Sequence, residues 1–384
     1  MSPIRRAASA LAVFLGAGLV PAAAAGQLTI SGQLDLVGKV RSDTLGLNTA
    51  LRGDSPYSPV RVRLFARHWL TDRIGVFAEV LYDSEADVRL NGAYAVLNEI
   101  AGQPWLNARL GLAPSLIGSF GLRSTYFNAN PLIGVPLLWQ YRTNLASDGT
   151  STAAGLAAVA GEPGGGTPIF YDSCWAIQWE LLGEAGVFEY SIGMTPGAVS
   201  NPIKARGVPG SQFLVRVGVS PFAGLRLGVS GAHGPYLSQP SPDAGGVLPY
   251  TADPGDFDQT VLGADLELLA GAWAFNAEAH AVRYEAPLIS ENLEALGGYV
   301  EARFDFLPGW YLAGRAGALF FNELVTDAQT GARTPWDRDT RRSELALGYR
   351  VTREVLVKLD WQRTAVPDSH FDQNLFAAQL SAVF

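Results

Sequence analysis

The chain has 384 residues, of which 48% are hydrophobic and 17% are charged, and its 28 Lys and Arg residues against 36 Asp and Glu residues give a formal net charge of −8. This composition excludes a disordered chain and a basic nucleic-acid-binding protein. A single cysteine, Cys174, excludes an internal disulfide framework.

Residues 1–25 have the features of a secretory signal peptide. Arg5 and Arg6 precede an apolar stretch, 7–25, that contains no acidic residue and ends in a run of alanines. A positive start, an apolar centre and small residues before the cleavage point are typical of such signals. We expect cleavage near Ala25 and export of the mature chain, 26–384.

Hydrophobic residues in the mature chain recur with a period of two. Val60, Val62 and Leu64 alternate with Arg61 and Arg63, and the pattern returns in residues 374–384. A strand with one apolar and one polar face requires this alternation, whereas a helix would spread the same residues around its circumference. The most apolar stretch of the mature chain, 261–282, is interrupted by acids, so we do not expect membrane-spanning helices.

The alternation predicts about sixteen strands of about 9–13 residues, the length that a tilted strand needs to cross a bilayer. We place them near 27–40, 59–69, 74–83, 87–97, 105–113, 172–182, 187–194, 211–220, 224–231, 259–269, 272–284, 296–306, 310–321, 341–351, 354–364 and 373–384.

Short and long connections alternate between these strands. Most long connections are rich in Gly, Pro, Asp and Ser, as in 232–258 and 285–295, and the longest is 114–171. This layout predicts an all-β fold, a transmembrane antiparallel up-and-down β-barrel. A soluble β-sandwich or propeller is the alternative, but its loops would not sort by length in this way.

Aromatic residues gather at the predicted strand ends. Such positions suit rings at the lipid headgroup level, so we expect two aromatic girdles. The short-turn ends carry Trp105, Phe222, Trp273, Trp310, Tyr349 and Phe384, and the long-loop ends carry Tyr82 and Tyr284.

Several short motifs resemble Gram-negative outer-membrane porins, in particular the superfamily that includes the phosphate-selective porins. The last strand, 377–384, ends in an aromatic residue as porin C-terminal strands do. Residues 108–114, 120–122 and 130–132 are similar to the entry into the third external loop, and 336–337, 341, 348–350 and 358–362 resemble the closing strands.

The resemblance implies a sixteen-stranded barrel, usually trimeric, whose third external loop folds into the lumen. That loop corresponds to 114–171 here, and Phe384 corresponds to the signal that the barrel-assembly machinery recognises. Phosphate-selective members use clusters of lysine, whereas this chain has only Lys39, Lys204 and Lys358.

Charged residues of the polar phase are distributed unevenly along the chain. If this phase lines a channel, an early basic wall faces a later acidic wall across the water, and the resulting field would orient dipolar solutes. The expected basic lining is Lys39, Arg61, Arg63, Arg67, Arg89 and Arg109, and the expected acidic lining is Asp265, Glu267, Glu278, Glu301 and Asp305. Alternatively, Arg61, Arg63 and Arg67 pair with Asp35, Glu79 and Asp83 on neighbouring strands.

Catalytic and metal-binding motifs are not recognisable. The four histidines, His68, His233, His280 and His370, have none of the spacings of metal-hydrolase sites. Glu278 and His280 share a strand phase and could exchange a proton, but a row of polar lumen residues predicts the same side chains without chemistry, and we favour that interpretation. We therefore expect no enzyme activity, no cofactor and no metal.

The sequence predicts an outer-membrane porin for passive diffusion of small hydrophilic solutes or ions. The expected partners are outer-membrane lipid and lipopolysaccharide, the solutes, the barrel-assembly machinery and two further copies in a homotrimer, with no nucleic acid. Two alternatives remain open: a plugged surface barrel that acts as an adhesin or structural protein, and an anion-selective channel of the phosphate type.

Overall fold

The structure is a computed structural model. It describes residues 26, 28–41, 46–49, 53–123, 129–159, 164–171, 175–201, 208–243, 246–367 and 372–384. The expected signal peptide, 1–25, lies outside the described residues, as do Cys174, Lys204 and His370.

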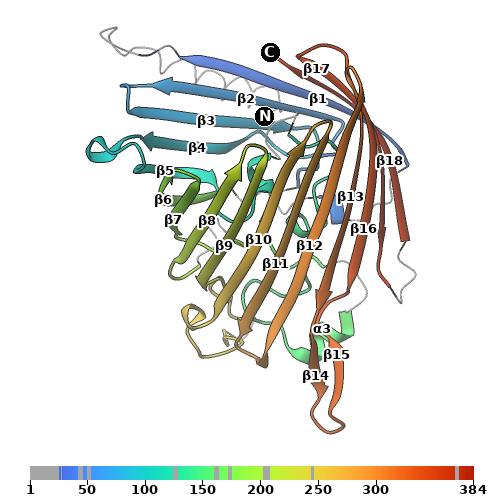
Figure 1. The fold of residues 1–384 in the computed structure, drawn as a ribbon. Helices are drawn as coiled ribbons and strands as arrows, with labels where there is room; N and C mark the ends of the chain where they lie inside the picture. Colours follow the sequence, from blue (N-terminus) through green and yellow to red (C-terminus); the bar gives the residue numbers. More distant parts are fainter. Residues whose placement is uncertain are drawn as a thin grey trace, which may run out of the picture.

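Sixteen antiparallel strands close into one barrel (Figure 1), as the alternation predicts. In sequence order they are β1 (Thr29–Arg41), β2 (Val60–Trp69), β3 (Ile74–Asp83), β4 (Arg89–Leu97), β5 (Asn107–Pro114), β6 (Trp175–Ala185), β7 (Phe188–Thr195), β8 (Gln212–Phe222), β9 (Leu225–Pro235), β10 (Asp258–Ala270), β11 (Trp273–Ala286), β12 (Ile289–Leu307), β13 (Trp310–Phe321), β16 (Thr340–Arg350), β17 (Val355–Ala365) and β18 (Asp372–Val383). Each strand pairs with its neighbour along the chain, and β1 pairs with β18 to close the ring.

The remaining elements lie in the connections. β14 (Glu323–Asp327) and β15 (Ala332–Pro335) form a separate hairpin between β13 and β16. The helical pieces are α2 (Phe120–Arg123), α3 (Ala153–Val159) and the short η1 (Gly46–Asn48), η2 (Ile100–Gly102), η3 (Leu137–Trp139) and η6 (Pro254–Asp256). Within the described part of the chain, none of the helices has the length and hydropathy to span a membrane.

One expected long loop is a strand hairpin instead. We expected a loop over 285–295, but β11 continues to Ala286 and β12 begins at Ile289. The polar residues of this segment suggest a loop. In the structure, Ser290 and Glu294 are exposed while Ile289 and Leu293 are buried, as on the two faces of a strand. The alternation therefore continues through the segment.

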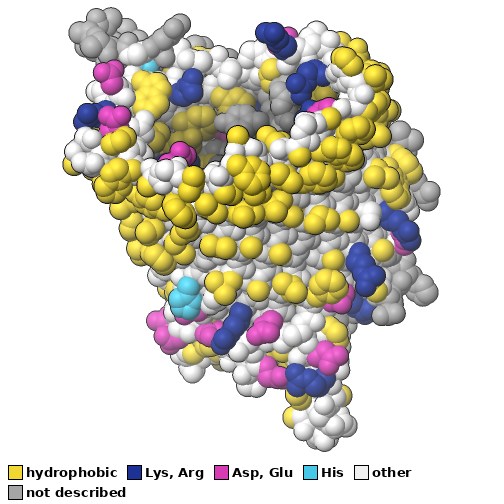
Figure 2. Space-filling model, in the orientation of Figure 1, with side chains coloured by type: hydrophobic (Ala, Val, Ile, Leu, Met, Phe, Trp, Pro, Cys, Tyr) yellow, Lys and Arg dark blue, Asp and Glu magenta, His cyan; other side chains and the backbone are white. Residues whose placement is uncertain are grey.

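The outer face of the barrel is apolar. Figure 2 shows hydrophobic side chains in a broad belt, with charged side chains gathered mainly at its two margins. Leu110, Leu262 and Val300 are among the outward side chains, each more than 60% exposed. The six aromatic residues expected at the short-turn ends are exposed as well: Trp105, Phe222, Trp273, Trp310, Tyr349 and Phe384.

The inner face is less polar than the sequence suggests. Tyr284, which we expected in an outer girdle, is fully buried and points inward, and so do Val261, Leu293 and Leu319. These side chains belong to the core that also contains Trp139 from the β5–β6 connection. We call the end of the barrel that carries the long connections the loop rim. The apolar inward side chains near this rim therefore pack against protein rather than water.

The ring closes through main-chain hydrogen bonds at the last residue. The Gly32 amide donates to the Phe384 carbonyl oxygen at 2.7 Å, and the Phe384 amide donates to the Gly32 carbonyl oxygen at 3.0 Å. The Phe384 ring occupies the space above Gly32, where any Cβ would overlap it. Glycine at position 32 therefore lets the terminal aromatic residue lie across β1.

We expect Gly32→Val to destabilise the closed barrel, because the added side chain displaces the Phe384 ring. Overpacking of this kind costs about 1–3 kcal/mol. Urea titrations of the purified protein in detergent measure the loss. Gly38→Val is the matched control, since nothing lies within 4 Å of a Cβ at Gly38 on the same strand. Equal stability of the two variants would contradict the closure that we describe.

Candidate functional site

The connection between β5 and β6 lies against the inner face of the barrel, where Glu278 of β11 anchors it. The Ser119 and Phe120 amides donate to Glu278 Oε1 at 2.6 Å and 2.5 Å, and the Trp139 indole Nε1 donates to Glu278 Oε2 at 2.9 Å. Glu278, expected in the acidic lining, is 3% exposed. Its charge is therefore used inside the protein to hold this connection.

A second anchor, formed by Asp360 and Lys358 of β17, holds residues 130–135 of the same connection. Asp360 Oδ2 accepts a hydrogen bond from the Ile133 amide at 2.8 Å. The Lys358 ammonium donates to the carbonyl oxygens of Asn130 at 2.8 Å and Leu132 at 3.1 Å. Buried main-chain groups of an irregular segment thus find charged partners on β17.

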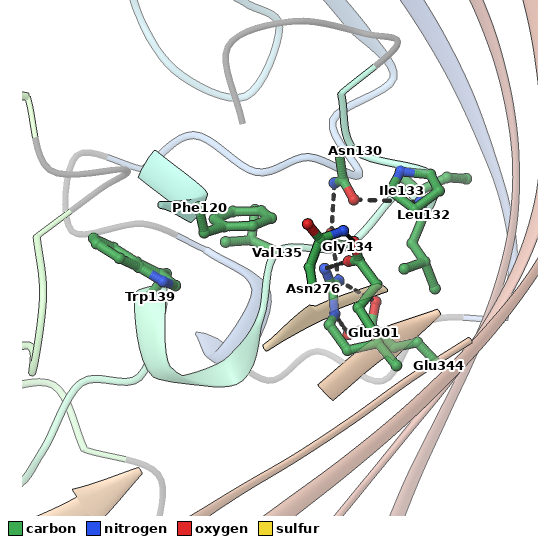
Figure 3. A network of polar contacts seen from close by, with 12 residues as sticks. Phe120, Asn130, Leu132, Ile133, Gly134, Val135, Trp139, Asn276, Glu301 and Glu344 are labelled. Carbon is green, nitrogen blue, oxygen red and sulfur yellow. Dashed lines mark hydrogen bonds and ion pairs between the residues drawn. The ribbon is translucent and has the colours of Figure 1, made fainter. Parts of the chain in front are cut away.

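Arg315 of β13 connects the second anchor to two acids. Its Nη1 donates to Glu301 at 3.0 Å, and its Nη2 donates to Glu344 at 2.8 Å and to the Gly134 carbonyl oxygen at 2.6 Å. Figure 3 shows Glu301 and Glu344 beside Gly134. Breaking a buried ion pair is costly, because it leaves one charge without a partner. Arg315 is therefore fixed in place by Glu301 and Glu344, and it in turn holds the connection at Gly134.

Sequence reasoning missed Arg315, Glu344, Lys358 and Asp360. All four belong to the inward phase of their strands, so the period of two could have placed them on the inner face. Their partners could not be predicted, because they are main-chain groups of a connection about 200 residues away in the chain.

Five of the six expected basic lining residues have acidic neighbours. Four of the pairs are Arg61 with Asp83 at 3.3 Å, Arg63 with Glu79 at 3.6 Å, Arg89 with Asp54 at 2.5 Å and Lys39 with Glu85 at 3.3 Å. Arg109 pairs with Glu180. Arg67 is exposed near the short-turn rim, and in the described ranges no ion pair reaches it.

The expected acidic residues outside the anchors also have neighbours of opposite charge. Asp265 accepts a hydrogen bond from Arg216 Nη2 at 2.8 Å, Glu267 lies 3.7 Å from Arg226, and Asp305 lies 2.6 Å from Arg303. Sequence reasoning missed Arg216 and Arg226. Positive and negative groups are therefore interleaved around the barrel. For Arg61 and Arg63 this agrees with the alternative that these arginines pair with acids of neighbouring strands.

A polar cavity of about 370 Å³ lies inside the barrel, between the start of the β5–β6 connection and strands β5 to β9. Ser115 and Gly118 border it on one side. Arg109, Arg216 and Arg226 border it on the other, together with Glu184, Glu189 and Ser191. Figure 2 shows the barrel hollowed at its upper rim, where Figure 1 places the C-terminus.

His280 lies beside the first anchor rather than in this cavity. Its Nε2 is 3.5 Å from Glu278 Oε2, and its ring meets Trp139 and Phe170 edge-on. Both side chains are buried, and neither borders the cavity. Among the described residues, no group of His, Cys, Asp and Glu has the arrangement of a metal site.

Comparisons with known proteins show the fold. The chain has the same fold as the outer membrane channel DcaP of Acinetobacter baumannii, with a TM-score of 0.58, 12% identity and coverage of 95% of this chain and 99% of that one. It is also similar to an anion-selective porin from Comamonas acidovorans, with a TM-score of 0.55, 10% identity and coverage of 94% and 100%.

A third similar structure is the trimer form of OmpT, an outer membrane protein of Vibrio cholerae, with a TM-score of 0.53, 13% identity and coverage of 94% and 100%. No family model and no curated protein sequence matches the chain. The likeness is therefore one of fold, a sixteen-stranded barrel of the porin type.

We expect Glu278→Gln to loosen the first anchor, because an amide is a weaker acceptor than a carboxylate for three N–H donors. Hydrogen exchange of the Ser119 and Phe120 amides, followed by mass spectrometry, should accelerate about tenfold or more. Glu267→Gln is the control: it removes an acid of the neighbouring strand that pairs with Arg226. Unchanged exchange in Glu278→Gln would contradict the anchor.

Asp337, in the connection between β15 and β16, binds the β5–β6 connection outside the barrel wall. It accepts hydrogen bonds from the Tyr141 hydroxyl at 2.8 Å and from the Asn144 and Arg338 amides, each at 2.7 Å. Burial raises the pKa of this carboxyl to about 6, against the lowering effect of the hydrogen bonds. The folded chain therefore favours the protonated form more than the unfolded chain does.

Because the pKa of Asp337 is raised in the folded chain, the protonated carboxyl stabilises the fold fully below about pH 4. This stabilisation is lost as the pH rises through about 6. Relative to Asp337→Asn, the wild type should lose up to about 3 kcal/mol of unfolding free energy between pH 4 and pH 7. Urea titrations of both proteins at each pH measure the difference. A difference that stays constant with pH would contradict the raised pKa.

Proposed function

We propose that the protein is an outer-membrane porin, a passive channel for small hydrophilic solutes or ions. The observation that carries the proposal is a closed barrel with an apolar outer face and a polar cavity inside. In hydrocarbon every main-chain polar group needs a partner within the protein, and a closed barrel supplies one because it has no edge strand. The solute gradient is the only energy source in this proposal.

The solute route in this proposal runs along β5 to β9. The opposite inner face, on β11 to β17, holds the anchors of the β5–β6 connection, so we place the passage between Ser115–Gly118 and the three arginines Arg109, Arg216 and Arg226. The segment 114–171 thus narrows the channel. Interleaved charges of both signs along the wall suit polar and zwitterionic solutes better than a single ion type.

Targeting and assembly complete the proposal. The signal peptide 1–25 would direct export, and the terminal Phe384 would present the last strand to the barrel-assembly machinery. The barrel would reside in the outer membrane of a Gram-negative bacterium, with its long connections outside. A homotrimer is consistent with the trimer form of the similar Vibrio cholerae protein.

A plugged surface barrel is the second candidate, and one observation favours it. Trp139, Phe170, Tyr284 and Trp336 belong to an apolar core that fills part of the lumen toward the loop rim. In that case the protein would act at the cell surface as an adhesin or a structural component. Single-channel recording in planar bilayers separates the two, because a porin gives discrete conductance steps and a plugged barrel gives none.

Filling the cavity tests the proposed route. We expect Ser191→Trp to lower the single-channel conductance by about half or more, because the large side chain enters a polar cavity of about 370 Å³. Ile192→Trp is the control on the same strand, since residue 192 is 39% exposed on the outer face. Equal conductance of wild type and Ser191→Trp would place the route elsewhere.

Charge removal tests the proposed basic lining. Changing Arg61, Arg63 and Arg67 together to Gln leaves Asp83 and Glu79 without these partners, so the lumen becomes more negative. The zero-current potential in a salt gradient should shift toward cation selectivity. An unchanged potential would mean that these side chains do not contact the conducting water.

A further inference from the structure

An apolar groove of about 800 Å³ crosses the outer face of β10, β11, β12, β13 and β16. Exposed side chains of Leu296 and Phe320 border it toward the loop rim, and Leu266 and Val300 border it on the other side. The groove lies outside the lumen and is separate from the cavity of the proposed route.

Strand register explains the shape of the groove. Along its floor, Ala264 pairs with Ala279, Ala279 with Gly298, Gly298 with Ala318 and Ala318 with Arg341. Four interstrand spacings give a row of about 19 Å. The row therefore forms a continuous furrow between larger side chains, and a charged residue stands at one end.

The two ends of the row lie at different depths. Arg341 is the second residue of β16 and follows the loop-side connection, whereas Ala264 lies in the middle of β10. Because barrel strands are tilted by about 35–45°, a row perpendicular to them also runs obliquely through the wall. The groove thus descends from the loop rim to mid-wall, and one leaflet of the hydrocarbon core is about 15 Å thick.

Arg341 differs from the other outward arginines near this rim. Arg283 lies 3.4 Å from Glu285, Arg363 lies 2.5 Å from Asp372, and Arg333 lies 2.8 Å from Glu291. In the part of the chain that the structure describes, no ion pair or side-chain hydrogen bond reaches the exposed Arg341. Exposed Ser343, which also borders the groove, adds a hydroxyl donor two residues away on the same face.

We propose that this groove binds the phosphorylated glycolipid of the outer leaflet, lipopolysaccharide. One acyl chain would lie along the floor from Ala318 to Ala264, and a phosphate of the lipid A headgroup would accept hydrogen bonds from the Arg341 guanidinium and the Ser343 hydroxyl. A planar guanidinium matches phosphate oxygens in geometry and charge. The inference rests on the proposed function, which orients the loop rim outward.

Charge complementarity favours this lipid over a second copy of the chain. A protein partner would have to bring a carboxylate to Arg341, and three of the outward acids of this chain, Glu285, Glu291 and Asp372, already pair with arginines. A phosphorylated lipid supplies the missing anion at the headgroup level and the apolar chain below it.

Native mass spectrometry of the full chain in detergent, titrated with purified lipid A that carries two phosphates, tests the site. We expect stoichiometric binding to wild type and about tenfold or greater weakening in Arg341→Gln, since hydrogen bonds to charged groups are among the stronger ones. Arg283→Gln removes the same charge from the same rim outside the groove and should bind as wild type does. Equal binding by Arg341→Gln, or equal loss in Arg283→Gln, overturns the proposal.

Two further binding experiments identify the molecule that occupies the groove. Ala279→Trp fills the floor without altering charge and should also weaken lipid A binding; wild-type affinity in this variant overturns the groove as the acyl site. Phosphatidylglycerol should compete poorly, and equal affinity for it overturns the commitment to lipopolysaccharide. Loss of oligomers in Arg341→Gln would assign the groove to a second copy instead.

Conductance keeps this proposal distinct from the proposed channel. Arg341→Gln and Ala279→Trp lie on the outer face, so both should retain wild-type single-channel steps. If the wild type shows conductance steps but does not bind lipid A, only the lipopolysaccharide site is refuted. If it binds lipid A but shows no conductance steps, only the proposed channel function is refuted.

Discussion

Closure of the strand ladder is the constraint on which the rest of the molecule depends. β1 pairs with β18 along eight residue positions, and Gly32 exchanges two hydrogen bonds with Phe384 at the rim. Alternate side chains of every strand point to opposite faces, and closure of the ring makes one face the outside of the barrel and the other the lumen. The apolar phase then covers the outside, and the other phase faces a lumen in which charged groups can meet.

Inside that ring, charge serves mainly to hold an irregular segment. Glu278 and Asp360 accept hydrogen bonds from main-chain amides, while Arg315 and Lys358 donate to main-chain carbonyl oxygens. A long connection inside a barrel has many main-chain groups that strands do not satisfy, and each costs free energy if buried alone. The charged inner face of β11 to β17 therefore fixes the connection on one side and leaves the cavity on the other.

The sequence predicted the fold well and the interior only partly. Alternation along Val60–Trp69 identifies a strand and its two faces, because period two is a local property. Period two does not distinguish an inward residue that meets water from one that meets protein, so it predicts Tyr284 in the outer girdle and Glu278 on an open wall, and both are buried in the protein. Arg216 and Arg226 were missed because their acidic partners, Asp265 and Glu189, become neighbours only through strand pairing.

The central claim is that the apolar phase of the strands faces lipid while the charged phase encloses water. It is tested most directly with a fluorescent label on a cysteine at Leu359, which is 53% exposed on the outer face, in a Cys174→Ser background. In bilayers with brominated acyl chains, we expect strong quenching by the lipid and little by aqueous iodide. Quenching by iodide alone would contradict the account.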